Sequence, residues 1–191
     1  MEIERKELIL KAAERLLARH GWQKTTVAGI AKEAHVAVGS VYLEFNSKTL
    51  IIHELSRAKY AYILRKMRRA ALSQGGYPER FTQMLNARTE GFLEILDTSS
   101  HGHDLLHSHC EGVHQAREFF IQAQRELLAD FLGAAQDDEV FAFDSLAQTT
   151  QAILLAYSHF TPPTLFGIPR EHVKPSLMAM HNLVISGLKQ K

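Results

Sequence analysis

Histidine and cysteine side chains suited to binding a transition metal recur between residues 101 and 114. Five of the eleven histidines of the 191-residue chain fall in this stretch, beside its single cysteine. Their spacings of four, three and four residues would place four of them on one face of a continuous helix. Imidazole nitrogens and a thiolate are ligands that zinc and copper favour. The spacing predicts a metal site, with heme held by one histidine as a variant, formed by His103, His107, Cys110 and His114.

The same stretch has a second interpretation without metal. Gly112 stands inside the expected stripe and is a candidate helix end. If the helix stops there, the histidines line a pocket or lie scattered on the surface. A metal-dependent enzyme is not favoured, because the chain has no HExxH motif, no nucleophile elbow and no phosphate-cradling glycine loop. We therefore predict that the chain is not an enzyme.

Apolar residues recur at helical spacing along nearly the whole chain, and no alternating strand pattern is found. Glycine and proline clusters, such as Gly75-Gly76 and Pro162-Pro163, separate the periodic stretches. The pattern predicts an all-α fold of three small helices followed by six larger ones. The expected helices cover residues 9–20, 27–34, 38–45, 48–73, 78–97, 103–110, 113–136, 144–160 and 170–190.

The second and third expected helices are joined by a three-residue turn, which is the spacing of a helix-turn-helix. Ile30, Ala31 and Ala34 are apolar or small, so the third helix can cross closely over the second. Val38 and Val41 are expected to cover one side of the third helix. The other side is then slim enough to enter the major groove of DNA, which is about 12 Å wide. It carries Gly39, Ser40, Tyr42 and Leu43.

From residue 9 to residue 50 the chain resembles the DNA-binding domain of TetR-family regulators. The matching residues are Ile9, Ala12, Ala13, Gly21, Thr25, Thr26, Val27, Ile30, Ala31, Ala34, Val36, Gly39, Ser40, Val41, Tyr42, Phe45 and Lys48. The resemblance implies that Thr26, Tyr42 and Lys48 bind DNA phosphates. It implies further that small residues of the third helix lie against base edges. The DNA-binding set is Thr26, Val38, Gly39, Ser40, Tyr42, Leu43 and Lys48.

Three residues depart from the family pattern. His35 stands where the turn normally begins with glycine, and histidine tolerates a left-handed backbone better than most residues do. Ala37 replaces the usual serine cap of the third helix, with loss of one hydrogen bond. Glu44 places a carboxylate near the DNA backbone, which is unfavourable unless it turns away. The sequence preference cannot be derived from these residues.

The resemblance also implies an N-terminal three-helix DNA-binding domain, residues 1–47, and a six-helix ligand-binding and dimerisation domain, residues 48–191. The last two helices would pair with their copies in a homodimer. The final helix carries one apolar stripe at Leu177, Met180, Val184 and Leu188 and another at Met178, His181 and Ile185. A small-molecule effector would bind among apolar residues of the middle helices. The expected lining is Phe81, Leu85, Phe92, Leu106, His107, Phe119, Tyr157 and Phe160.

The leading prediction is a repressor that leaves its double-stranded DNA operator when the effector binds. A metal- or heme-responsive repressor and a protein-interaction adaptor are the alternatives. The longest strongly apolar run, residues 152–156, is too short to cross a membrane. A single cysteine, Cys110, cannot form an internal disulfide, and the chain starts without an export signal. We therefore expect a cytoplasmic protein with no membrane partner.

Overall fold

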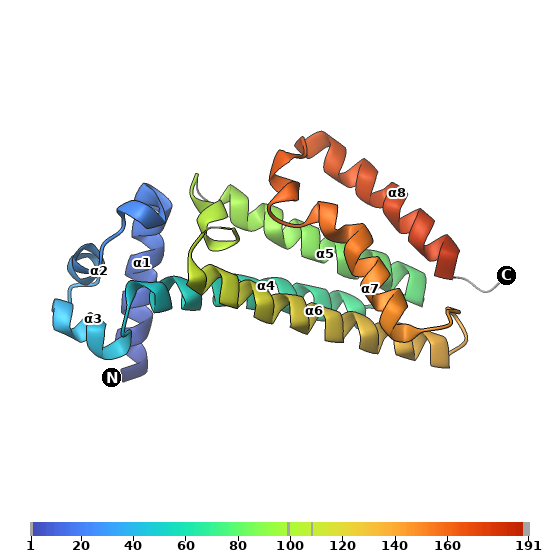
Figure 1. Cartoon of the computed structure of the whole chain (residues 1–191), viewed down its shortest axis with the longest axis horizontal. Helices are drawn as coiled ribbons and strands as arrows, with labels where there is room; N and C mark the ends of the chain where they lie inside the picture. Colours follow the sequence, from blue (N-terminus) through green and yellow to red (C-terminus); the bar gives the residue numbers. More distant parts are fainter. Residues whose placement is uncertain (1, 99, 108, 189–191) are drawn as a thin grey trace. The chain divides into compact units, whose positions relative to one another are not determined.

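A computed structural model describes residues 2–98, 100–107 and 109–188 of the chain. Over these residues the backbone forms eight α-helices, three short 3-10 helices and no strand, which confirms the predicted all-α fold (Figure 1). None of the described helices is long and apolar enough to cross a membrane. The chain separates into two compact units, Met1–Ala61 with Leu93–Phe119 and Tyr62–Phe92 with Phe120–Lys191. The domain boundary expected after residue 47 stays a prediction.

The first unit contains α1 (Glu2–Lys24), α2 (Val27–Glu33), α3 (Val38–Glu44) and the first half of α4 (Lys48–Ala71). Their apolar faces close over one core, in which full burial of each large side chain contributes about 1.5–3 kcal/mol. Small and large apolar side chains from all four helices are buried there. They include Ile9, Ala12, Ala13, Leu17, Ile30, Ala31, Val41, Phe45 and Ile51.

Two residues with left-handed backbone shape the ends of these helices. Gly21, at φ 74°, breaks the helical path near the end of α1, as its sequence position predicts. Thr25 then donates a hydrogen bond of 2.8 Å to the Gly21 carbonyl, and Thr26 caps α2 by accepting from the Gly29 amide at 3.0 Å. His35, at φ 56°, takes the left-handed turn position where glycine is usual. The helix-turn-helix therefore forms despite that departure.

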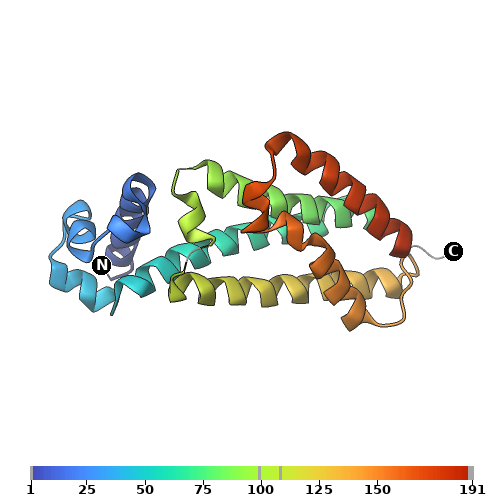
Figure 2. The same cartoon turned by 45° about the horizontal axis from the view of Figure 1, so that its top comes forward.

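The second unit is built from the second half of α4 together with α5 (Tyr77–Asp97), α6 (Glu111–Asp137), α7 (Leu146–Ala156) and α8 (Arg170–Leu188), although α5 and α6 also extend into the first unit. In both views the second half of α4 runs beside α5 (Figures 1 and 2). Ile63 of α4 lies 3.0 Å from the point where Gly91 of α5 would carry a Cβ. The rings of Phe81 and Phe131 join α5 to α6 at 6.4 Å between centroids. Two 3-10 helices, η2 (Tyr157–Phe160) and η3 (Thr164–Gly167), connect α7 to α8.

The short helix expected over residues 103–110 is not formed, so the described residues contain eight α-helices rather than nine. In its place a single 3-10 turn, η1 (Gly102–Leu105), precedes α6. Asp104 uses its carboxylate to accept the backbone N–H of Trp22 at 2.8 Å, and Tyr60 donates to the Leu106 carbonyl at 2.8 Å. These contacts hold the segment as an irregular connection within the first unit.

Gly112 does not separate two helices, as the sequence suggested, but lies in the first turn of α6. A Cβ on this residue would lie 2.5 Å from the Thr49 carbonyl oxygen and 3.1 Å from the His53 amide nitrogen of α4. Real Cβ atoms do not approach a carbonyl oxygen so closely. The glycine is therefore needed for the close approach of α6 to α4 and not for a helix end.

Candidate DNA-binding surface and ligand site

The outward face of α3 is open to solvent while its inner face is buried. Val41 is fully buried in the core of the first unit, whereas Tyr42 is 51% and Leu43 80% exposed. No atom lies within 4 Å of the point where Gly39 would carry a Cβ. Val38, expected to cover one side of the helix, is exposed instead, because it begins the helix beyond the core. Ser40 is half-buried.

The charged residues beside this face are held by ion pairs and hydrogen bonds. Glu44 pairs with Arg5 at 3.4 Å and its side chain is mostly covered, so the carboxylate is turned away and partly neutralised. Lys48 donates from Nζ to the Trp22 carbonyl at 2.7 Å and lies 4.2 Å over the Trp22 ring. Burial lowers the pKa of Lys48. Its ammonium keeps two further N–H donors for a phosphate.

The predicted effector residues do not all come together. Five of the eight are buried in the second unit, namely Phe81, Leu85, Phe92, Tyr157 and Phe160. The rings of Phe81 and Tyr157 pack edge to face, with 6.1 Å between their centroids.

The remaining three predicted effector residues belong to the first unit. Phe119 is 53% exposed, and the guanidinium of Arg57 lies 5.8 Å from its ring centroid. Leu106 is buried, and His107 is half-buried beside a histidine-rich pocket. Leu106 and His107 lie in the irregular segment before α6, whereas Phe119 lies within α6.

A buried arginine lies in the aromatic core of the second unit. Arg88 is 1% exposed. Its guanidinium donates to the Tyr157 carbonyl at 3.0 Å and to the Gln124 side-chain oxygen at 3.3 Å, and it lies 5.8 Å from the Tyr157 ring centroid. Burial lowers the pKa of Arg88 to about 10, so the side chain remains charged at neutral pH.

His181 extends this polar group inside the core. Its Nδ1 shares a hydrogen bond of 2.7 Å with the Tyr157 hydroxyl, and its Nε2 pairs with the Asn86 side-chain oxygen at 3.1 Å. Because Asn86 accepts through its oxygen, Nε2 carries the proton and Nδ1 accepts from Tyr157. Burial, with a smaller effect from the charge of Arg88, lowers the pKa of His181 to about 4. The imidazole is therefore neutral at physiological pH.

The N-terminal helices match a known family in sequence. Residues 9–55, which span the whole helix-turn-helix, match the family model described as bacterial regulatory proteins, tetR family. Over these residues the chain is similar to the TetR family. This confirms the resemblance predicted from the residues, and the family is one of regulators rather than enzymes.

Curated relatives match the chain over less than half of its length. The helix-turn-helix-type transcriptional regulator YerO of Bacillus subtilis (strain 168) is 34% identical over 99 residues, which are 49% of this chain and 33% of that protein. YhgD of the same organism is 34% identical over 71 residues, 37% of this chain and 35% of that protein. The chain spans about a third of the length of these relatives.

Solved structures match nearly the whole fold. The fatty acid degradation regulator FadR of Bacillus halodurans is similar with a TM-score of 0.71 and 19% identity, over 98% of this chain and 97% of that one. FadR of Bacillus subtilis, solved in complex with stearoyl-CoA, has a TM-score of 0.71 and 18% identity, over 95% and 98% of the two chains. A TetR/AcrR-family regulator of Thermobifida fusca has a TM-score of 0.72 and 16% identity, over 98% and 100%. At these identities the likeness shows the fold alone.

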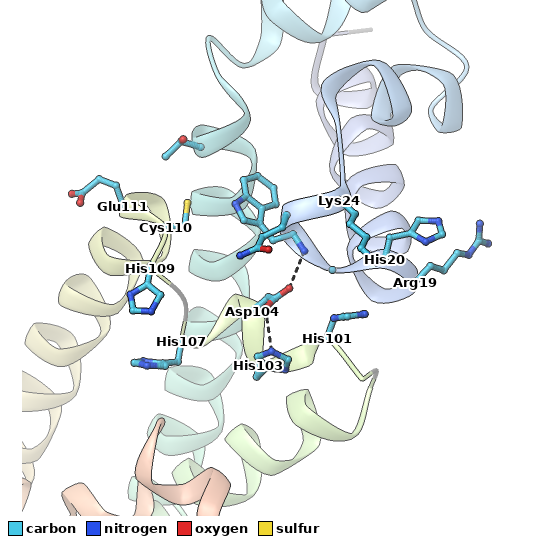
Figure 3. Close-up of a pocket in the computed structure, with 14 residues that line it drawn as sticks. Arg19, His20, Lys24, His101, His103, Asp104, His107, His109, Cys110 and Glu111 are labelled. Carbon is cyan, nitrogen blue, oxygen red and sulfur yellow. Dashed lines mark hydrogen bonds and ion pairs between the residues drawn. The ribbon is translucent and has the colours of Figure 1, made fainter.

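The histidine-rich stretch of the chain lines an open pocket of about 890 Å³ in the first unit (Figure 3). His103 pairs with Asp104 at 3.2 Å, while His107, His109 and Cys110 do not converge on one point. The stripe with His114 is lost, because His103 lies in the short 3-10 turn η1 whereas His114 lies within a separate helix, α6. Over the described residues no group of three His, Cys, Asp or Glu side chains is placed to hold a metal ion. The predicted stripe of four metal ligands is therefore not formed by the residues that the structure describes.

Sequence reasoning missed the polar residues of the second unit. Arg88 follows Leu85 and precedes Phe92 on the apolar face of α5, at offsets of three and four. A charged residue on an apolar stripe is the pattern that would have identified it. His181, which lies on one of the two predicted apolar stripes of the final helix, is buried against its own unit.

We expect the stability of the protein to fall between about pH 6.5 and about pH 4 through His181. The pKa is lower in the folded than in the unfolded chain, so the unfolded chain binds a proton first as pH falls. The stabilisation is complete above the unfolded value, decreases below it and is lost below the folded value. The shift corresponds to on the order of 3 kcal/mol.

Melting temperatures at about pH 7.5 and about pH 5, compared between wild type and His181→Gln, measure this contribution. Glutamine does not titrate, so the difference between the two pH values should shrink in the variant. An equal pH dependence in both proteins would contradict the assignment.

Proposed function

We propose that this chain is a DNA-binding transcriptional regulator, a repressor that acts in the cytoplasm and leaves its operator when a small molecule binds the helical region 48–191. The observation that carries the proposal is the outward face of α3. It is slim and exposed at Gly39, Tyr42 and Leu43, on a helix whose other face is fixed by Val41 and Phe45. A helix with such a slim, exposed face fits the major groove of duplex DNA.

The DNA contacts divide into positioning and base-reading groups. Thr26, Tyr42 and Lys48 would contact phosphates, since each lies at or near a helix start or on the exposed face. Val38, Gly39, Ser40 and Leu43 would lie along base edges. Lys48 is already positioned by Trp22, so its ammonium loses little conformational freedom on binding.

The effector would bind in the second unit, around the aromatic residues of α5 and η2. Support comes from the gathering of Phe81, Tyr157 and Phe160 with a few polar groups, which is the composition of small-molecule sites. A structurally similar regulator, FadR of Bacillus subtilis, was solved in complex with stearoyl-CoA. Effector binding would favour a conformation in which the two recognition helices no longer match successive turns of DNA.

Pairing of two chains through α7 and α8 completes the proposal. Leu155 of α7 and Met178 and Leu183 of α8 are exposed large apolar side chains. Their cover by a second copy would remove apolar surface from water. A two-fold dimer would then read two half-sites about 34–36 Å apart.

Gel-shift titration with DNA flanking the gene, against unrelated competitor DNA, tests the proposal. We expect specific binding at two chains per operator fragment. Tyr42→Phe should weaken binding to all sequences similarly, and Lys48→Met should lower the salt dependence by about one phosphate contact. A complex of one chain would contradict the pairing, and binding without preference over competitor DNA would contradict the function.

A further inference from the structure

Arg88 carries a buried positive charge that no described carboxylate neutralises. Its two hydrogen bonds go to neutral acceptors, the Tyr157 carbonyl and the Gln124 amide oxygen. The Nε–H is buried and has no partner. Burial lowers the pKa of Arg88, and the one opposing effect comes from Tyr157 and not from a carboxylate. A guanidinium with a free edge is therefore held within the second unit.

Such an arrangement is unfavourable for the folded protein by itself. Removing a cation from water costs several kcal/mol unless a counter-charge or enough hydrogen bonds replace the hydration. The end of α7, where the Tyr157 carbonyl accepts, compensates part of the charge through the helix dipole. The Nε–H remains unsatisfied, and it is one side of the fork that binds a carboxylate with two parallel hydrogen bonds.

The groups connected to Arg88 set the charge that its ligand should have. The Tyr157 hydroxyl, His181 and Asn86 form a hydrogen-bonded chain that is neutral at physiological pH. Its members and Arg88 therefore present one positive charge. A single negative charge balances it, whereas a phosphate monoester with nearly two charges would leave an excess in the core. The neighbouring side chains are aromatic, with the Phe81 ring packed against both Tyr157 and His181.

We propose that the effector is an amphipathic organic monocarboxylate whose carboxylate pairs with Arg88 and whose apolar body lies against the aromatic residues around Phe81. This inference rests on the proposed function, because it assigns the chemistry of the effector of that same site. The carboxylate accepts from the free Nε–H and from a neighbouring Nη–H. Gln124 turns its amide away from Arg88 when the ligand enters.

The test is a binding titration of the full-length protein with decanoate, 3-phenylpropionate and stearate. Each acid is compared with its uncharged primary amide, and stearate is compared with stearoyl-CoA. We expect at least one acid to bind and to release operator DNA, with its amide about thirtyfold weaker. Arg88→Met should weaken the acid by a similar factor and leave operator binding intact. Arg88→Lys keeps the positive charge but cannot form two parallel hydrogen bonds with a carboxylate. It should bind the acid about fivefold more weakly than wild type.

Several outcomes would overturn the inference. These are binding of none of the three acids, equal binding of an acid and its amide, unchanged acid binding in Arg88→Met, or tighter binding of stearoyl-CoA than of stearate. If Arg88→Met does not fold, the Arg88→Lys titration decides, and acid affinity equal to wild type contradicts the fork. Operator binding in the absence of ligand is measured separately. If the wild-type protein does not bind its operator without ligand, the proposed function is contradicted. If it binds the operator but no acid releases it, only the carboxylate effector is contradicted.

Discussion

Replacing Gly39 by glutamate should abolish operator binding while leaving the protein as stable as wild type or slightly more stable. Gly39 is the second residue of α3, and no atom lies within 4 Å of the position of its Cβ. A glutamate there replaces a poor helix former and places a negative charge in the first turn of a helix, where the dipole favours it. Each effect is worth about 0.5 kcal/mol.

On DNA the same side chain has the opposite effect. If α3 enters the major groove, a carboxylate at residue 39 approaches base edges and phosphates without a cation to pair with. The added side chain also prevents the close contact between helix and DNA that glycine allows. We expect the affinity for the operator to fall about a hundredfold or more, which corresponds to roughly 3 kcal/mol. Gel-shift titration and thermal melting of the same preparation measure both quantities.

Gly167→Glu is the matched control for Gly39→Glu. Gly167 also has no atom within 4 Å of its Cβ position, and it lies in η3 between α7 and α8. The substitution adds the same charge and volume outside the first unit, so operator affinity should stay within about twofold of wild type. Equal losses in the two variants would mean that net charge, and not the position on α3, weakens binding. Full affinity in Gly39→Glu would remove α3 from the DNA interface.

The helix-turn-helix was predictable because its constraints are local. The turn, the cap at Thr26, the buried spacing of Ile30 and Val41, and the exposed face of α3 depend on residues within about twenty positions of one another. Even the departures followed from local physics. His35 adopts the left-handed backbone that histidine tolerates, and Ala37 leaves the start of α3 without a side-chain cap.

The proposed ligand site was predictable only in part, because its contacts join distant segments. Spacing alone identified Phe81, Phe92 and Tyr157 as apolar, but an aromatic residue on a helical stripe has the same pattern whether it lines a site or fills a core. The contact of Arg88 with residues 36 and 69 positions away is not encoded in any short window. The metal hypothesis failed for a similar reason, since the tertiary contacts of Asp104 and Leu106 replaced the helix that local spacing suggested.

Replacing Gly112 by alanine should destabilise the protein strongly, although alanine is the better helix former. In α6 the helix preference alone would stabilise by about 1 kcal/mol. The new methyl group would lie 2.5 Å from the Thr49 carbonyl oxygen and 3.1 Å from the His53 amide nitrogen. Both are backbone atoms of α4 and cannot move aside as a flexible side chain would. The two helices must separate, which costs about 2–4 kcal/mol in total for such overpacking.

Gly133→Ala in the same helix isolates the steric effect. Its Cβ would meet only Leu146 Cδ2, at an ordinary contact distance of 3.8 Å, so the helix preference should prevail and raise the melting temperature by about 1–3 °C. Gly112→Ala should lower it by roughly 5–10 °C. Because Thr49 follows Lys48 at the start of α4, the displacement should also weaken operator binding at temperatures where the variant is folded. A melting temperature at or above wild type would show that α6 does not need the close approach at Gly112.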